Sequence, residues 1–452
     1  MGRVLFTLLK RFAIAGNAGD SMQIIADFHI HSHFSRATSK DMDIEEISRN
    51  GKLKGLQLVG TGDFTHPSWL EEIREKLVPN ETQSGSGIFE HRGMLWMLTG
   101  EVATIYTQDG KTRKVHHVLH APSIDVVEQV NEALEKYGKL AADGRPMLSG
   151  LSSPALVELL MQISKDILIY PAHAWTSWFG VLGEFSGFDS LEECYLDQTR
   201  HVHALETGMS SDPAMNWRVS GLDRVTILSN SDSHSPWPWR IGREANVFEI
   251  DEGKLTYAEI NDAITGKDPE RLKFTIEVDP SYGKYHFTGH RACGVSMSPE
   301  EAKKRDNICP VCKRKLTIGV AQRVEEVADR PAGFSPEGAI PFKSVIPLYE
   351  VLSAALGVNN LYSKRVVEQQ DVLIAKFGNE LNVLLNVAEN ELRAVAGEAI
   401  ANAIVRVRDG DVRYIPGYDG VYGIPVLSEE DYERLRTKRT GEAKEQRSLE
   451  DF

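Results

Sequence analysis

Three histidines stand at alternate positions in the segment DFHIHSH, residues 27–33. In an extended chain alternate side chains share one face, so His29, His31 and His33 would point the same way. Imidazole is the commonest metal ligand in proteins, and two on one strand can chelate a single ion. Taken alone, the segment fits either a metal site or a solvated strand edge.

Further ligand-type side chains occur where other apolar runs end. Because parallel β/α folds gather the carboxyl ends of their strands on one face, we expect these side chains to meet there. Several such ligands can hold two or three divalent ions about 3.5–4 Å apart, the usual device for activating water against a phosphoester. The residues in question are Asp63, His66, Glu101, His173, Asp232 and His234, and the arm KVHHVLH offers His116, His117 and His120.

The elements that must position these residues lie between Ile24 and about Phe274, where short β-rich runs alternate with helical stretches. Alternation on this scale predicts βα units and a parallel sheet, open or closed. One interruption is the pair Asp109-Gly110 between two alternating runs, which indicates a β-hairpin. Expected strands are IIADFHIH, LQLVGTG, LWMLTG, DILIYPAH, HALETG and VTILSNSD, and expected helices are 44–50, 68–77, 125–137 and 154–164.

A second chemical cluster lies further along, in HRACGVSMSPEEAKKRDNICPVCKRK. Two knuckles at this spacing suit tetrahedral zinc with thiolate and imidazole ligands, rather than free thiols or a redox pair. His286 is a reserve ligand, and the isolated Cys194 is expected to be a core thiol. The predicted zinc ligands are His290, Cys293, Cys309 and Cys312.

Charge separates this cluster from the rest of the chain. The 452 residues carry a formal net charge of −14, which excludes a wholly basic nucleic-acid coat. The knuckle region is nevertheless basic, and such a patch would bind phosphates in a salt-sensitive, sequence-independent way, unless it is only a solvated surface. Its cations are Lys303, Lys304, Arg305, Lys313, Arg314 and Lys315.

Tryptophans adjoin two of the expected ligands. Trp175 and Trp178 follow His173, and the pair Trp237 and Trp239 follows His234. Unpaired nucleic-acid bases stack on aromatic rings, although loop tryptophans also serve as plain hydrophobic lids. Two cations close behind are candidates for gripping a phosphate, namely Arg240 and Arg243.

The organisation that follows is a leader over residues 1–21, a metal-dependent barrel over 22–275, a zinc module over 276–330 and a mainly helical region with a charged tail over 331–452. No apolar run approaches the roughly 18 residues needed to span a bilayer. The signal-like N-terminus is interrupted by Lys10 and Arg11. We therefore expect a cytoplasmic protein that is not bound to membranes.

Across roughly residues 24–275 the opening HxH, the Glu and His after strands and the closing DxH resemble the polymerase and histidinol phosphatase (PHP) superfamily. The resemblance implies a distorted (β/α)7 barrel and phosphoester hydrolysis. One departure is Thr61-Gly62-Asp63-Phe64, where the family usually has Thr-Asp-His, so the ion that Asp63 binds is open. The implied metal ligands are His29, His31, Asp63, Glu101, His116, His173, Asp232 and His234.

Two neighbouring histidines are set apart by the same resemblance. The spacing of VLHA favours His116 over His117, which should face the other way and be packed or hydrogen-bonded. The family pattern does not require His33, and the strand is expected to turn after Ser32. We expect His33 behind the ligands or on the substrate side.

The order of PHP motifs, Trp-rich loops, His/Cys module and a helical region ending in PGYDGVYG resembles the endonuclease Q family of DNA-repair nucleases, over nearly the whole chain from Met22. The resemblance implies incision of DNA 5′ of uracil, hypoxanthine, xanthine or an abasic site, leaving a 3′-hydroxyl and a 5′-phosphate. It implies a flipped base, structural Zn²⁺ with Zn²⁺ also in the barrel, Mg²⁺ or Mn²⁺ for activity, and a sliding clamp as a candidate partner.

On this reading Asp232, Glu101 and His234 are the catalytic residues. The expected DNA contacts are Trp175, Trp178, Ser210, Ser211, Trp237, Trp239, Arg240, Arg243, Lys313 and Arg314. Two alternatives stay open. A small-molecule phosphatase would share the metal chemistry but needs no zinc module, and a non-catalytic nucleic-acid-binding protein would need no intact ligand set.

Overall fold

The structure is a computed structural model that describes residues 21–80, 85–358 and 360–439. The expected leader falls outside these residues except for Ser21. Within the described part, a search for helices long and apolar enough to cross a membrane finds none.

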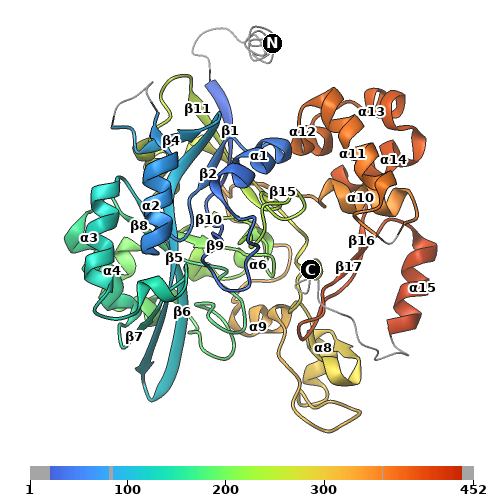
Figure 1. The fold of residues 1–452 in the computed structure, drawn as a ribbon. Helices are drawn as coiled ribbons and strands as arrows, with labels where there is room; N and C mark the ends of the chain where they lie inside the picture. Colours follow the sequence, from blue (N-terminus) through green and yellow to red (C-terminus); the bar gives the residue numbers. More distant parts are fainter. Residues whose placement is uncertain (1–20, 81–84, 359, 440–452) are drawn as a thin grey trace, which may run out of the picture.

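Strands from the first part of the chain curl into a barrel (Figure 1). Parallel pairs join β1 to β2, β2 to β5 and β9 to β10, and β6 lies antiparallel between β5 and β8. The strands are β1 (Ser21–Asp27), β2 (Leu58–Gly60), β5 (Met94–Gln108), β6 (Lys111–Ala121), β8 (Leu168–Pro171), β9 (Ala204–Glu206) and β10 (Thr226–Leu228).

Single hydrogen bonds rather than continuous ladders close this barrel. Between β8 and β9, the amide of Ala174 donates to the carbonyl of Glu206 at 2.9 Å. Between β10 and β1, the amide of Phe28 donates to Asn230 Oδ1 at 3.0 Å, and the amide of His31 donates to the carbonyl of Ser233 at 3.0 Å. The single hydrogen bonds at these two closures and the antiparallel β6 make the barrel irregular. The predicted distorted α/β barrel is confirmed.

The helices of the barrel begin at side-chain caps, except α2, which begins with Pro67 and has no side-chain cap. Asp43, Ser123 and Ser152 each accept a hydrogen bond from a first-turn amide, which satisfies a donor that the helix itself cannot pair. The first helix runs past its expected end and stops at Gly55, whose φ of 115° a glycine adopts readily. The helices are α1 (Ile44–Lys54), α2 (Pro67–Lys76), α3 (Ile124–Leu134), α4 (Ser153–Ile163), α5 (Leu191–Tyr195), α6 (Pro213–Asn216) and α7 (Tyr257–Ile264).

The predicted hairpin at Asp109-Gly110 is confirmed. β5 and β6 pair up to Gln108 and Lys111, and the two turn residues have φ of 53° and 74°. Positive φ at both central positions is the geometry that Asp-Gly favours in a two-residue hairpin loop. This long ribbon brings residues of two strands, Glu101 and His116, to the same end of the barrel.

Shorter strands extend the sheet on both sides. β11 pairs with β1, and β12 lies between β11 and β15, while β4 pairs with β5 and β7 pairs with β5 elsewhere along its length. These strands are β3 (Val78–Pro79), β4 (Ile88–His91), β7 (Met147–Ser149), β11 (Ala245–Asp251), β12 (Leu272–Glu277) and β15 (Phe342–Ser344). Single 3₁₀ turns occupy Leu140–Ala142, Leu196–His201, Ser220–Leu222, Pro269–Arg271, Pro280–Tyr282 and Arg291–Cys293.

The cysteine-rich part has a small apolar core of its own, made of Val295, Met297, Ala302, Cys309 and Leu316. So few apolar residues bury little surface, and domains with such cores usually need metal or disulfide support. The elements around it are β13 (Thr288–His290), β14 (Val295–Met297), α8 (Pro299–Lys303) and α9 (Val320–Val327).

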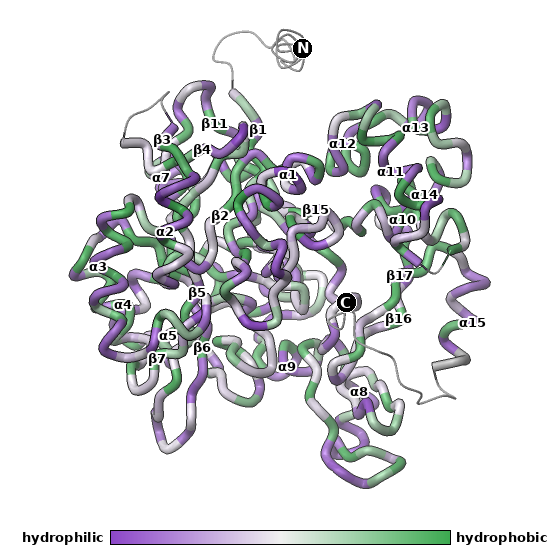
Figure 2. The backbone as a smooth tube through the Cα atoms, in the orientation of Figure 1, coloured by the Kyte–Doolittle hydropathy of each residue, from purple (hydrophilic) through white to green (hydrophobic). Residues whose placement is uncertain are grey.

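The C-terminal part is mainly helical, as predicted, and lies beside the barrel with α12 next to α1 (Figure 1). A separate apolar cluster between Ile346 and Val407 holds its helices together, whereas α15 is mostly hydrophilic (Figure 2). Its elements are α10 (Leu348–Ala355), α11 (Lys364–Phe377), α12 (Glu380–Leu385), α13 (Glu389–Ala396), α14 (Glu398–Arg408), β16 (Arg413–Ile415), β17 (Ile424–Val426) and α15 (Glu429–Arg439).

The segment PGYDGVYG returns from this helical part to the cysteine-rich part. Backbone bonds join Gly417 to the carbonyl of Ser281 at 2.8 Å, and the amide of Phe287 to the carbonyl of Gly417 at 2.8 Å. A Cβ on Gly417 would lie 2.2 Å from a backbone oxygen, and one on Gly423 would lie 2.0 Å from another. The glycines are therefore required by close approach of two backbones.

Candidate metal centre

The predicted ligands lie on turns at one end of the barrel strands. His29 and His31 follow β1, which ends at Asp27, so the HxH pair lies just past the strand rather than along it. Three other predicted residues have left-handed backbone, with φ of 46° at Asp63, 30° at His173 and 46° at Asp232. Such conformations are strained for residues other than glycine and are concentrated at functional sites.

Two groups of ligand atoms form at this end, each with all its atoms within 4.8 Å of one another. The first contains His29, His31, Glu101 and Asp232, and the second contains Glu101, His116 and His173. Imidazole nitrogens and carboxylate oxygens in such sets suit zinc and manganese, and the carboxylates also suit magnesium. The chemistry of the donors thus fits a centre of more than one ion.

Glu101 belongs to both groups, with one oxygen in each. Its Oε2 lies 3.4 Å from Nε2 of His29 and 3.3 Å from Nε2 of His31. Its Oε1 lies 2.7 Å from Nδ1 of His116 and 3.2 Å from Nε2 of His173. The carboxylate could therefore contribute one oxygen to each group.

One buried atom supports this interpretation directly. Nε2 of His29 is buried, yet it makes no hydrogen bond to any residue that the structure describes. The ring's other nitrogen, Nδ1, lies 3.0 Å from both carboxylate oxygens of Glu206. An imidazole held by a carboxylate on one side and left unpaired on the other is the arrangement of a metal-ligating histidine.

Asp63 stands behind the other histidine of the pair. Its Oδ1 lies 2.9 Å from Nδ1 of His31, and its Oδ2 accepts from the amide of Ser32 at 2.6 Å and the hydroxyl of Ser35 at 2.8 Å. The carboxylate is fully engaged and lies outside both ligand groups. The structure therefore places Asp63 behind His31, where it would orient that predicted ligand, rather than among the grouped ligand atoms.

Neighbouring histidines and an arginine lower the pKa of two carboxylates in the centre. Burial by itself would raise the pKa of Glu101, but His116, Arg145 and His29 hold that pKa well below its ordinary value. Burial likewise opposes ionisation of Asp232, and His29 and His31 bring its pKa well below normal. These pKa directions favour the ionised form of both carboxylates, which is the form that binds cations.

The remaining predicted histidines lie beside the groups or away from them. His234 is outside both groups; its ring centroid lies 4.4 Å from that of His31, and its Nδ1 bonds the carbonyl of Asp232 at 3.0 Å. His33 bonds the carbonyl of Met42 at 3.2 Å, at the far side of the turn. His117 is buried and bonds Tyr195, Thr104 and Ser153, as the sequence predicted.

Sequence reasoning missed two residues of the site. Glu206 lies within the expected strand HALETG and ends the observed strand β9, so the strand-end rule that found Glu101 could also have found it. Arg145, whose Nη1 lies 3.1 Å from Oε2 of Glu101, comes from a loop with no distinguishing pattern. His66 packs its ring against Phe34 at 4.3 Å and belongs to neither ligand group.

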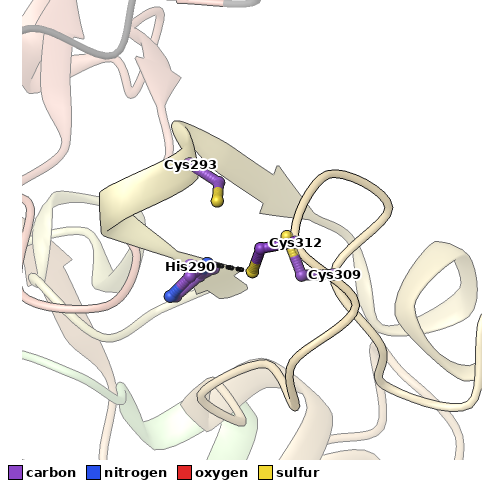
Figure 3. Close-up of side chains that lie close together, drawn as sticks. All are labelled: His290, Cys293, Cys309 and Cys312. Carbon is purple, nitrogen blue, oxygen red and sulfur yellow. Dashed lines mark hydrogen bonds between the residues drawn. The ribbon is translucent and has the colours of Figure 1, made fainter.

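The cysteine-rich part forms a third group, drawn in Figure 3. Ligand atoms of His290, Cys293, Cys309 and Cys312 all lie within 4.8 Å of one another, and Sγ of Cys312 is 3.4 Å from Nδ1 of His290. His286 is not in the group, because its ring packs on Phe287. Cys194 is fully buried, as predicted. The four donors fit a closed tetrahedral zinc site.

The aromatic residues expected to contact DNA divide into exposed and buried ones. Trp178 is 43% exposed and stacks on Phe185, which is 48% exposed. Trp175 is completely buried, and its indole nitrogen donates to Asn216 at 2.8 Å. Its expected role in stacking a base is therefore corrected to one in the core.

The second tryptophan pair lies at the contact with the helical part. Trp237 stacks on Trp239 with ring centroids 5.8 Å apart. Trp239 in turn meets Tyr349 at 4.7 Å and Tyr362 at 5.0 Å. The loop that follows Asp232 is thus held by aromatic contacts from the C-terminal helices.

The polar residues expected to contact DNA also divide into buried and exposed ones. Arg243 is buried and donates to the carbonyl of Ser231 at 3.0 Å, so it supports the backbone before Asp232. Ser210 and Ser211 are buried, and the Ser211 hydroxyl donates to the carbonyl of Thr207 at 2.8 Å. Arg240 is half-buried, while the knuckle cations Lys313 and Arg314 are exposed.

Known proteins are similar to parts of this chain or to most of it. The family model described as the MJ0043 C-terminal domain matches residues 347–411. The uncharacterized protein MJ0043 of Methanocaldococcus jannaschii is 33% identical over 254 residues, 56% of this chain, which spans only 31% of that protein. The uncharacterized protein YqxK of Bacillus subtilis is 28% identical, with 89% of this chain and 98% of that protein covered.

Two solved structures match almost the whole chain. The lesion-specific endonuclease PfuEndoQ from Pyrococcus furiosus has a TM-score of 0.80 and 33% identity, covering 92% of this chain and 99% of its own. Endonuclease Q in complex with a 27-mer duplex substrate carrying an abasic lesion has a TM-score of 0.80 and 34% identity, covering 90% and 98%. Fold and identity agree over this length: the chain belongs to the endonuclease Q family.

Proposed function

We propose that this protein is a metal-dependent endonuclease that incises DNA on the 5′ side of deaminated bases or abasic sites. The observation that carries the proposal is the carboxylate of Glu101, one oxygen of which faces His29 and His31 while the other faces His116 and His173. Pairs of ions held in this way serve phosphodiester hydrolysis. One relative, endonuclease Q, was solved in complex with a duplex substrate carrying an abasic lesion, which supports the substrate class.

The chain's own residues position the reaction. His29 and His31 present Nε2 to the centre, because Glu206 and Asp63 hold their opposite nitrogens. Asp232, whose Oδ1 lies 3.1 Å from Nε2 of His31, completes the first group, and the predicted catalytic residue His234 lies beside it. Bound divalent ions would supply an activated water and neutralise charge on the phosphate.

Two exposed surfaces are suited to hold the nucleic acid. The knuckle cations, all exposed, are Lys303, Lys304, Arg305, Lys313, Arg314 and Lys315. The stacked pair Trp178 and Phe185 lies on the loop that follows His173, where an unpaired base can pack against it. Flipping of the damaged base, Zn²⁺ with Mg²⁺ or Mn²⁺ as the ions, and a sliding clamp as partner remain predictions within this proposal.

The test is incision of duplexes that carry one uracil, hypoxanthine, xanthine or abasic site. We expect a single cut 5′ of the lesion, leaving a 3′-hydroxyl and a 5′-phosphate, in Mg²⁺ or Mn²⁺ and not in a chelator. Asp232→Asn, which keeps the shape of the side chain, should lose at least about 10³-fold in rate, while the exposed-surface control Glu71→Gln should not change it. Hydrolysis of sugar or amino-alcohol phosphates with lesion DNA left intact would overturn the proposal in favour of a small-molecule phosphatase.

A further inference from the structure

Arg145 places a guanidinium directly against the carboxylate that the two ligand groups share. Its Nη1 lies 3.1 Å from Oε2 of Glu101, the oxygen that also faces His29 and His31. The side chain is 27% exposed, whereas Glu101 is fully buried. Arg145 therefore lies between the first ligand group and the solvent.

The backbone that carries Arg145 is fixed from several directions. The amide of Gly144 donates to the carbonyl of Phe34 at 3.2 Å, and the hydroxyl of Thr65 donates to the carbonyl of Gly144 at 3.1 Å. The amide of Ala103, next to the metal-site strand residue Glu101, donates to the carbonyl of Pro146 at 3.0 Å. The loop is tied to the turns that carry His31 and Asp63 and to β5 itself.

Close approach strengthens this restraint. A Cβ on Gly144 would lie 2.2 Å from Oδ2 of Asp63 and 2.3 Å from Oγ of Ser35. The loop thus rests on the carboxylate that orients His31, and only glycine fits at this point. An arginine delivered by a loop fixed in this way has a defined position relative to the first ligand group.

The chemistry of the guanidinium suggests which chemical group the other N–H donors of Arg145 would bind. It carries five N–H donors in a planar fork, is charged at all relevant pH values, and matches phosphate geometry better than an ammonium group does. One nitrogen bonds Glu101, and the side chain is partly exposed. A phosphate drawn to the first ligand group could meet the remaining N–H donors of Arg145.

We propose that Arg145 forms a phosphate subsite that binds a non-bridging oxygen of the scissile phosphodiester. The inference rests on the proposed nuclease function. A purely structural role is the competing explanation, in which Arg145 only neutralises the buried charge of Glu101 and meets no substrate.

A thermodynamic cycle built from four DNA-binding affinities separates the two roles. Affinity for a lesion duplex is compared with affinity for the same duplex bearing an uncharged methylphosphonate at the scissile position, for the wild-type chain and Arg145→Gln. Both are measured without added Mg²⁺ or Mn²⁺ and with the proposed structural zinc retained, so that no cleavage is expected and other contacts cancel in the cycle. We expect methylphosphonate to weaken wild-type binding about tenfold more than it weakens binding by the variant, the size of one charged hydrogen bond.

Arg36→Gln is the matched control, because Arg36 is 74% exposed and pairs with Asp143 at the start of the same loop. It should show the wild-type response to methylphosphonate. Metal content and single-turnover rate are measured in parallel; Arg145→Gln should keep its metal content and lose about 10²-fold or more in rate, as for a lost electrostatic donor. Arg145→Lys should restore charge but only part of the rate.

Two results would overturn the subsite. One is an unchanged response to methylphosphonate in Arg145→Gln, and the other is a rate loss explained entirely by lost metal. Either result with an active wild-type chain leaves the proposed function standing. A wild-type chain that incises no lesion duplex refutes the proposed function itself, and the subsite with it.

Discussion

Oδ1 of Asp63 lies 2.9 Å from Nδ1 of His31, and the carboxylate of Glu206 lies 3.0 Å from Nδ1 of His29. The two histidines of the HxH pair therefore each have a carboxylate behind them, one following β2 and the other ending β9. Such partners fix the tautomer and the orientation of a ligating ring and raise its basicity. The pair is presented to the metal centre by three different strands.

Asp63→Asn should weaken metal binding without unfolding the barrel. An amide can still occupy the space and accept from the ring, but it removes the charge that orients His31, at a cost of about 10–100-fold in metal affinity. Glu206→Gln should have a similar effect through His29. Competition with a fluorescent chelator measures the affinity, and an unchanged value in both variants would refute the orienting role.

The contact between α1 and α12 contains a buried ion pair. Nζ of Lys54 lies 2.6 Å from Oε1 of Glu380, which also accepts the amide of Leu348 at 3.1 Å, and both side chains are almost fully buried. Lys54→Met leaves an uncompensated carboxylate and should lower the free energy of unfolding by about 3–5 kcal/mol. Urea denaturation followed by tryptophan fluorescence measures this.

Two comparisons make this test specific. Lys52→Met, on the same helix but exposed, should cost little. The double variant Lys54→Met with Glu380→Leu should recover much of the loss, because no buried charge is left unpaired. A single variant as stable as the wild-type chain would contradict the importance of the pair.

Zinc removal should unfold the small cysteine-rich part. Its core has few apolar residues, and Cys309 is both one of them and a proposed ligand. Cys309→Ala should lose one equivalent of zinc and make residues 288–316 accessible to protease and to hydrogen exchange, since metal binding supplies folding energy in such modules. Cys194→Ala, a buried cysteine outside the group, should keep its zinc.

Asp212 should make stability depend on pH. Burial, with Asp279 adding to it, raises the pKa of Asp212 from 3.8 to about 6. The folded state then holds a proton that the unfolded state releases, so stability falls as pH rises from about 4 to 6 and stays lower above 6. Asp212→Asn keeps a side chain that can cap α6 through the amide of Met215 and removes this penalty.

The expected result is a variant that is more stable than wild type at pH 7.5 by up to about 2–3 kcal/mol, the free-energy equivalent of the shift. The difference should close near pH 3.5, where both states of the wild-type carboxyl are protonated. Thermal unfolding at several pH values measures it. A difference that does not change with pH would point to capping alone.

The sequence predicted much of this site because strand ends follow a general rule. His29, Glu101, His173 and Asp232 were found from where apolar runs stop, and the barrel's topology then brings those ends together. Asp63 obeyed the same rule but has another role, because its left-handed φ of 46° and the donors of Ser32 and Ser35 turn its carboxylate behind His31. The type of a residue and its position in the sequence do not reveal which way its side chain points.

Other features depended on packing that has no local signal. Arg145 reaches Glu101 because its loop is bonded to two distant turns and to β5. Trp175 and Trp178, three positions apart, resemble each other in sequence, yet one is buried against Asn216 and the other is exposed. The hairpin at Asp109-Gly110 was predictable because its conformation is set by the two turn residues themselves.

The return of PGYDGVYG to the cysteine-rich part has a consequence for biosynthesis. Gly417 and Gly423 bond the carbonyls of Ser281 and Tyr282, which emerge from the ribosome long before them. The barrel has its ligands by Asp232 and His234 and can fold while translation continues. The segment around Phe287, however, lacks its partner backbone until the last part of the described chain is made. Pairing of residues 281–287 with this returning segment is therefore a late step, which follows synthesis of the whole barrel.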